Sequence, residues 1–185
     1  RLLNGWSRDK KKGSERYDRI PVKFAEEVCI DRREDYMQFV PYDLPEQFFL
    51  YVGSVIERKN LLNICKALFL LRNELEIPLV VIGDGGKYKQ QVKDFITQNG
   101  LQSKVIFLSE HEKARTSPSF RSAKVFPAIY QSAIAMIYPS FFEGFGIPVL
   151  EALWSRLPVI TSSVYYLPEE GEAGAYYVKP ESTKK

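Results

Sequence analysis

The feature that most constrains the fold of this chain is a series of short apolar segments separated by stretches with helical periodicity. From Phe48 onward, apolar runs of four to six residues alternate with such stretches. We expect strands at residues 48–52, 79–82, 105–108, 134–138, 158–161 and 175–178. Strands that are apolar throughout and separated by helices are typical of a parallel sheet covered on both faces. The sequence therefore predicts a doubly wound α/β domain with right-handed crossovers.

Helices are expected between these strands, and some of their ends carry recognisable signals. Asn60 is placed to cap a helix that extends to residue 71, and Gly100 is placed to close the next helix in a left-handed conformation. Further helices are expected near 126–132 and over 148–155. After the third strand we expect a polar loop of about fifteen residues.

Length and composition place the chain among ordinary globular domains. Its 185 residues are 45% hydrophobic and 26% charged, which excludes disordered, collagen-like and disulfide-scaffold classes. We expect a linker with one helix over residues 1–45 and a Rossmann-like domain over 46–185. Because the chain starts at Arg1, we expect it to be a piece of a longer protein, with this domain cut short at its C-terminal end.

Charge, cysteines and hydropathy limit the partners and the compartment. The net charge of +3 is spread along the chain, so no nucleic acid partner is expected. Cys29 and Cys65 lack the spacing of metal ligands, which indicates a reducing, cytoplasmic setting. No apolar run reaches the length of about 18 to 20 residues that a membrane span needs. Peripheral attachment of the longer protein to the inner face of a membrane stays open.

A doubly wound sheet binds ligands at the loops that follow its strands, and residues 140–148 form the most informative of these loops. This turn contains two glycines and leads into a helix whose expected first residue is Pro148. Backbone N–H groups and the helix dipole there favour an anion, a phosphate in particular. Glu143 and Glu151 flank the turn, and ionised carboxylates suit the vicinal hydroxyls of a sugar or a ribose. The alternative is that both are solvated acids that stabilise the helix dipole.

Two other loops carry candidate groups. After the first strand, Arg58 and Lys59 lie at the N-terminal end of a helix, where cations are favourable only if an anion binds. Both suit contact with a diphosphate, and the alternative is a solvated surface pair. After the second strand, the glycines of 83–86 lack the third glycine of a dinucleotide motif, because Tyr88 stands there, so no nicotinamide cofactor is expected. His111 has no partner at a recognisable spacing and is expected to be structural.

The segment E-G-F-G-I-P-V-L-E, from Glu143 to Glu151, resembles the E-x7-E signature of retaining glycosyltransferases of the GT-B fold, family four in particular. Other segments resemble the same family and occur in its order along the chain. They are Y-V-G-S-V-I-E-R-K-N (51–60), L-V-V-I-G-D-G-G (79–86), P-V-I-T-S (158–162) and L-P-E-E (167–170). Five segments in register make a much more specific resemblance than the signature alone.

The resemblance implies that this chain is the C-terminal, donor-binding half of a GT-B enzyme. It implies that Glu143 and Lys59 are the catalytic residues, with Glu143 on the donor sugar's hydroxyls and Lys59 on the diphosphate. Glu151 would hold the ribose hydroxyls. The remaining residues of the implied donor site are Gly53, Ser54, Arg58, Gly83, Gly144, Phe145, Gly146 and Ile147. No metal ion or other cofactor is implied.

The implied activity is transfer of a hexosyl group, with retention, from a UDP- or GDP-sugar to a glycan or lipid-linked acceptor in polysaccharide biosynthesis. The acceptor would bind an N-terminal domain outside this chain, so the chain alone is expected to be inactive. Two positions depart from the family: Ser54 stands where many members have arginine, and Arg156 where glycine is common. The alternatives are a sugar-nucleotide epimerase with the same architecture and a nucleotide-binding module without catalysis.

Overall fold

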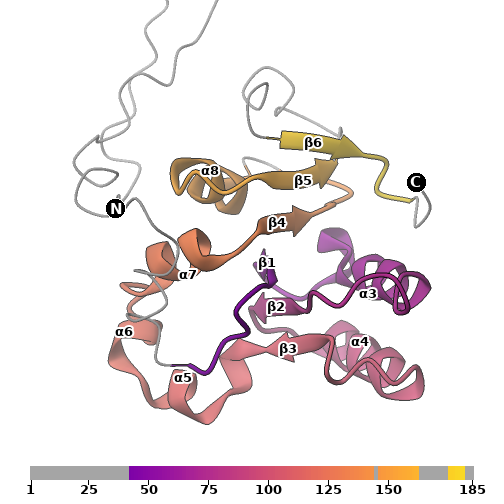
Figure 1. The fold of residues 1–185 in the computed structure, drawn as a ribbon, viewed down its shortest axis with the longest axis horizontal. Coiled ribbons are helices and arrows are strands. Elements are labelled where there is room, and N and C mark those ends of the chain that lie inside the picture. The colour runs from indigo at the N-terminus through magenta and orange to yellow at the C-terminus, as the bar shows by residue number, and fades with distance from the viewer. Residues whose placement is uncertain (1–41, 144–145, 163–174, 182–185) are drawn as a thin grey trace, which may run out of the picture.

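The computed structural model describes residues 42–143, 146–162 and 175–181, which form one parallel sheet with helices on both sides (Figure 1). The strands in these residues are β1 (Phe49–Val52), β2 (Leu79–Ile82), β3 (Val105–Phe107), β4 (Ala135–Tyr138), β5 (Val159–Ser162) and β6 (Ala175–Val178). Neighbouring strands are all parallel, and their order is β3-β2-β1-β4-β5-β6. The predicted doubly wound α/β fold is confirmed, and the strand bounds differ from those predicted by at most one residue.

Helices connect the strands and cover the two faces of the sheet. They are η1 (Glu57–Lys59), α3 (Leu61–Leu70), α4 (Lys87–Gln98), η2 (Leu108–Glu110), α5 (Glu112–Thr116), α6 (Pro118–Arg121), α7 (Phe126–Ser132) and α8 (Ile147–Trp154). Figure 1 shows α3 and α4 on one side of the sheet and α5 to α8 on the other. The connection from β3 to β4 thus crosses from the first side to the second.

The prediction of a polar loop after the third strand is wrong, because this segment contains the short helices α5 and α6. Ser117 caps α6 by accepting a hydrogen bond from the Phe120 N–H (3.2 Å), and Pro118 is the first residue of that helix. Only Ala114 of α5 and no residue of α6 is buried, so neither helix produces an apolar period that sequence reasoning detects.

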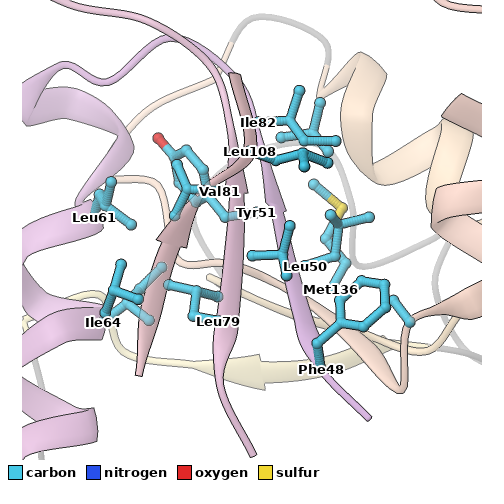
Figure 2. Packing of buried hydrophobic residues seen from close by; sticks show 14 of the residues in the cluster. Phe48, Leu50, Tyr51, Leu61, Ile64, Leu79, Val81, Ile82, Leu108 and Met136 are labelled. Carbon is cyan, nitrogen blue, oxygen red and sulfur yellow. The ribbon is translucent and has the colours of Figure 1, made fainter. Parts of the chain in front are cut away.

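Apolar side chains fill both sides of the sheet. All four residues of β2 are buried. Figure 2 shows Leu61 and Ile64 of α3 on the same side as Leu79, with Leu50 and Met136 on the other side. Burial on both faces explains why the strands are apolar throughout rather than alternating.

Of the two helix caps predicted from the sequence, one is confirmed and the other differs. Gly100 has a φ of 65° after α4, and the Leu101 N–H donates to the Ile96 carbonyl (2.9 Å), so the predicted left-handed cap is confirmed. Asn60 precedes α3 as predicted, but its side chain makes no capping hydrogen bond. Its Nδ2 instead donates to the carbonyls of Pro139 (3.0 Å) and Pro180 (2.7 Å), which stabilises two distant segments against α3.

The predicted linker with one helix over residues 1–45 lies outside the described residues except for its last four positions. Cys65 is a buried free thiol in α3. Among the helices described, none combines the length and the apolar character needed to cross a membrane.

Candidate functional site

The candidate site lies at the carboxyl ends of β1 and β4, the two neighbouring strands from which the connections lead to opposite faces of the sheet. A crevice at this point is where doubly wound sheets bind ligands. The loops after the two strands meet there, because the Phe141 N–H donates to the Arg58 carbonyl (2.9 Å). The segment 53–60 and the described start of the segment 140–148, which sequence reasoning singled out separately, therefore belong to one site.

Lys59 and Glu143 are direct partners in this site, with 3.2 Å between Nζ and Oε1. Lys59 Nζ also donates to the Tyr138 hydroxyl and lies 4.7 Å from the centre of that ring. Glu143 Oε1 accepts hydrogen bonds from Ser140 Oγ (2.7 Å) and Tyr138 (3.1 Å), and Oε2 lies 3.1 Å from Arg58 Nη1. We name these five residues the Lys59–Glu143 cluster. The side chains of Lys59 and Glu143 are only 10% and 15% exposed, so the pair is largely withdrawn from water.

The charges in the cluster support one another. Burial alone would raise the pKa of the Glu143 carboxyl, but the hydrogen bond from Ser140 and the charges of Lys59 and Arg58 outweigh it, so this pKa lies below its ordinary value. Burial and the negative charge of Glu143 raise the pKa of Tyr138. The phenol therefore stays protonated, donating to Glu143 while it accepts from Lys59.

Arg58 faces the loop after β4. Its Nη1 donates to the Phe142 carbonyl (2.6 Å) as well as pairing with Glu143, while its side chain stays 40% exposed. The alternative of a solvated surface pair is wrong, because Lys59 is buried and Arg58 contacts Glu143 and the Phe142 carbonyl in the loop after β4. Ser54, which stands at the position of the missing arginine, is exposed in the same loop.

Glu151 belongs to a second pair, formed by α8 and α7. Tyr130 of α7 is buried and donates its hydroxyl to Glu151 Oε2 (2.9 Å). Burial raises the pKa of the Glu151 carboxyl, and the hydrogen bond from Tyr130 acts in the opposite direction. A carboxylate has about four acceptor positions, so one bond from a phenol leaves capacity for vicinal hydroxyls. The alternative that both glutamates are solvated acids is wrong, since each is at least partly buried and partnered.

The start of α8 has the geometry of an anion-attracting helix terminus. Gly146 is its N-cap with a left-handed φ of 63°, Ile147 is the first helical residue and Pro148 follows. The expectation that Pro148 comes first is wrong by one position, although proline is equally tolerated there because the N–H groups of the first turn have no partner within the helix. Gly144 and Phe145, which were predicted to bind the donor, lie outside the described residues.

Gly53 and Gly83 are required by a close crossing of two loops. A Cβ on Gly83 would lie 1.9 Å from the Gly53 carbonyl oxygen. Their N–H groups are engaged within the protein, that of Gly53 with the Ile82 carbonyl (2.9 Å) and that of Gly83 with Ser109 Oγ (2.9 Å). Gly53 also makes room for Lys59, whose Nζ lies 3.3 Å from the position of a Cβ. These two glycines thus allow the two loops to cross and leave space for the side chain of Lys59.

The loop after β2 lies beside a separate set of ion pairs, which joins it to α4 and η2. Lys89 Nζ lies 2.7 Å from Asp84 Oδ1 and 2.8 Å from Glu110 Oε1, and Lys93 pairs with the other oxygen of Glu110 (2.7 Å). His111 directly precedes α5. Within the described ranges, no three histidine, cysteine or acidic side chains gather as a metal ion would require.

Sequence reasoning missed the hydroxyl groups that position both glutamates. Tyr138 and Ser140 lie at the carboxyl end of β4, where polar residues that follow an apolar strand are a usable signal. Tyr130 had no such signal, because a tyrosine in an apolar helical run is typical of a core position.

A parallel sheet in this order, with acidic and basic side chains at the carboxyl ends of β1 and β4, defines a Rossmann-like α/β fold. Residues 32–185 match the family described as glycosyl transferases group 1. The chain therefore belongs to that family, and the resemblance found in the sequence is confirmed.

Two curated relatives are mannosyltransferases. Over 146 residues the chain is 32% identical to the O-antigen chain mannosyltransferase RfbU of Salmonella typhimurium, a match that covers 79% of this chain and 38% of the relative. It is 31% identical over 130 residues to the O-antigen chain mannosyltransferase B of Escherichia coli, which covers 69% of this chain and 32% of the relative. The chain thus spans a third to two fifths of these proteins.

A solved structure confirms the fold. The C-terminal domain of the glycosyl transferase group 1 family protein LpcC from Francisella tularensis superposes with a TM-score of 0.65 at 23% identity. The match covers 83% of this chain and 77% of that domain. The predicted relation to the C-terminal half of a GT-B fold is therefore confirmed.

Proposed function

We propose that this chain binds the nucleotide-sugar donor of a retaining hexosyltransferase. The observation that carries the proposal is the Lys59–Glu143 cluster at the carboxyl ends of β1 and β4, beside the N-terminus of α8. A buried cation and a helix N-terminus attract a diphosphate, and the carboxylates of Glu143 and Glu151 suit hydroxyl groups on either side of it. Family membership supports the same placement.

In this proposal each group acts on one part of the donor. Glu151 accepts hydrogen bonds from the ribose hydroxyls, with Tyr130 fixing its orientation. Glu143 accepts hydrogen bonds from hydroxyls of the sugar. When the bond between the anomeric carbon and the diphosphate breaks, negative charge grows on the leaving diphosphate, where Lys59 and the first turn of α8 stabilise it. These are charges that the protein supplies itself, so the proposal includes no resident metal ion or other cofactor.

The names of the relatives suggest the sugar and the kind of acceptor. Two of them are O-antigen chain mannosyltransferases, so we infer mannose as the transferred sugar, carried on GDP or UDP, and a growing surface glycan as the acceptor. Because the chain spans less than half of these relatives, acceptor binding and turnover are assigned to the protein of which this domain is a part.

Isothermal titration of the 185-residue chain with GDP, UDP, ADP and NAD tests the proposal. GDP or UDP should bind, and NAD should not. Binding of NAD alone would support a redox enzyme instead. Failure of every nucleoside diphosphate and of its sugar-linked form would favour a module that has lost the donor site. GDP-mannose and UDP-glucose then identify the sugar class.

A further inference from the structure

One carboxylate holds both cations of the loop after β1. Glu143 Oε1 lies 3.2 Å from Lys59 Nζ and Oε2 lies 3.1 Å from Arg58 Nη1. Tyr138 adds a hydrogen bond to each member of the Lys59–Glu143 pair, and Ser140 adds one to the carboxylate. The two groups predicted to neutralise a diphosphate are therefore already neutralised in part by the group predicted to hold the sugar.

This pairing opposes the binding of an anion. A diphosphate that binds at Lys59 competes with Glu143 for this cation, and separating a largely buried ion pair is unfavourable because each charge then lacks its partner. The carboxylate would also repel the phosphate oxygens. A nucleotide therefore gains the full attraction of Lys59 and Arg58 only if Glu143 acquires other hydrogen-bond donors.

The sugar of a nucleotide-sugar supplies such donors, whereas a free nucleoside diphosphate does not. Without Glu143, a cationic site would favour the free diphosphate, because its terminal phosphate has a second pKa of about 6 and so carries about one more negative charge at neutral pH. With Glu143 in place, sugar hydroxyls occupy the carboxylate and release Lys59 toward the diphosphate. After transfer the hydroxyls leave with the sugar, and the carboxylate returns to Lys59.

We propose that Glu143 sets the preference of this site for a donor that still carries its sugar, by competing with the diphosphate for Lys59 and Arg58. This inference rests on the proposed function, because it assigns the hydroxyls of the sugar to Glu143. Glu143 is then a specificity-determining residue that weakens rebinding of the released nucleoside diphosphate and so favours product release.

The test compares two ligands on the unaltered chain and on Glu143→Gln, by isothermal titration at low salt. The ligands are the nucleoside diphosphate that binds, GDP or UDP, and its sugar-linked form, GDP-mannose or UDP-glucose. Glutamine keeps the shape and one acceptor oxygen but removes the charge, and its amide nitrogen, a donor, cannot replace the oxygen that faces Arg58. The free diphosphate should bind about tenfold more tightly to the variant, since coupled neighbours typically interact with energies equivalent to a few-fold to a hundredfold in affinity. The sugar-linked form should gain no affinity.

A double-mutant cycle separates competition for Lys59 from simple repulsion. In a Lys59→Met background, Glu143→Gln should increase the affinity for the free diphosphate by less than half as much as it does in the unaltered chain. The reason is that the cation released by the substitution is no longer present. A gain of the same size in both backgrounds would mean that repulsion alone acts and would overturn the inference. Glu57→Gln is the matched control: this exposed acid in the same loop changes the net charge equally and should leave both affinities within about twofold.

Thermal unfolding of every variant shows whether it is folded, so that a change in affinity is not confused with loss of the fold. If Glu143→Gln does not fold, Glu143→Asp replaces it, because a shorter carboxylate keeps the charge and weakens the hold on Lys59, so the free diphosphate should again bind more tightly. An affinity for the free diphosphate that is unchanged or lower in the folded variant refutes the inference. Failure of the unaltered chain to bind both the nucleoside diphosphates and their sugar-linked forms refutes the proposed function itself, and this inference with it.

Discussion

Gly83→Ala should destabilise the chain strongly, although the residue lies in a surface loop. The added methyl group would lie 1.9 Å from the Gly53 carbonyl oxygen, far inside van der Waals contact, and the nearest atoms are backbone rather than a flexible side chain. The two loops cannot separate easily, because the Gly53 N–H is bonded to the Ile82 carbonyl at the end of the β1–β2 pair. Overpacking costs about 1 to 3 kcal/mol, and a backbone clash places this variant at the upper end, about 3 kcal/mol.

Urea and thermal unfolding measure this loss. For a chain of this size, about 3 kcal/mol corresponds to a fall of roughly 6 to 12 °C in Tm. Gly86→Ala is the matched control in the same loop, because a Cβ there meets no atom within 4 Å. It should change stability by less than about 1 kcal/mol. Equal stabilities of the two variants would refute the close crossing of the loops.

Four further predictions follow from the site and the helix ends. Glu151→Ala should weaken nucleotide binding by about 1.5 to 3 kcal/mol in a titration, since it removes charge-assisted hydrogen bonds to the ribose, and an unchanged affinity would contradict its assignment. Lys59→Ala should weaken nucleotide binding in the same titration, because it removes the buried cation proposed to contact the diphosphate, and an unchanged affinity would contradict that role. The pKa of Glu143 is lowered from 4.5 in the folded chain, so its contribution to stability is full above that pH and is lost as the pH falls through the lowered value. Glu143→Gln should therefore be less stable than the unaltered chain at neutral pH, with the difference shrinking on acidification in unfolding experiments; a constant difference would contradict this. Arg156 has a left-handed φ of 55° in the same kind of helix end as Gly100, so Arg156→Gly should raise the free energy of unfolding by roughly 0.5 to 1 kcal/mol and Gly100→Arg should lower it, as urea titration would show.

The sequence was sufficient for the fold because strands such as β2, all four residues of which are buried, are apolar throughout. An apolar run such as 79–82 predicts a buried strand without information from other segments, and the glycine after α4 shows where that helix ends. Arg156 forms the same left-handed helix end without a glycine, so no local signal predicted it. Asn60 was predicted to cap α3, but carbonyls 79 and 120 residues away bind its amide instead, and such long-range competition is invisible in a local pattern.

The candidate site was predictable in its segments but not in its pairings. Periodicity identified the loops that carry Lys59 and Glu143, whereas their contact depends on β1 lying beside β4, which the order of elements along the chain does not specify. The roles of Tyr138 and Tyr130 depend on where each hydroxyl points, and tyrosines in apolar segments are usually core residues. The buried pair of Lys59 with Glu143 was therefore beyond sequence reasoning.

A crystal structure of the chain with bound GDP or UDP would show directly whether the Lys59–Glu143 cluster, at the carboxyl ends of β1 and β4, holds the donor. We expect a diphosphate within hydrogen-bond distance of Lys59 Nζ and the first turn of α8, with the ribose hydroxyls on Glu151. A nucleotide bound instead at the 83–86 loop, with the Lys59–Glu143 pair untouched, would contradict it.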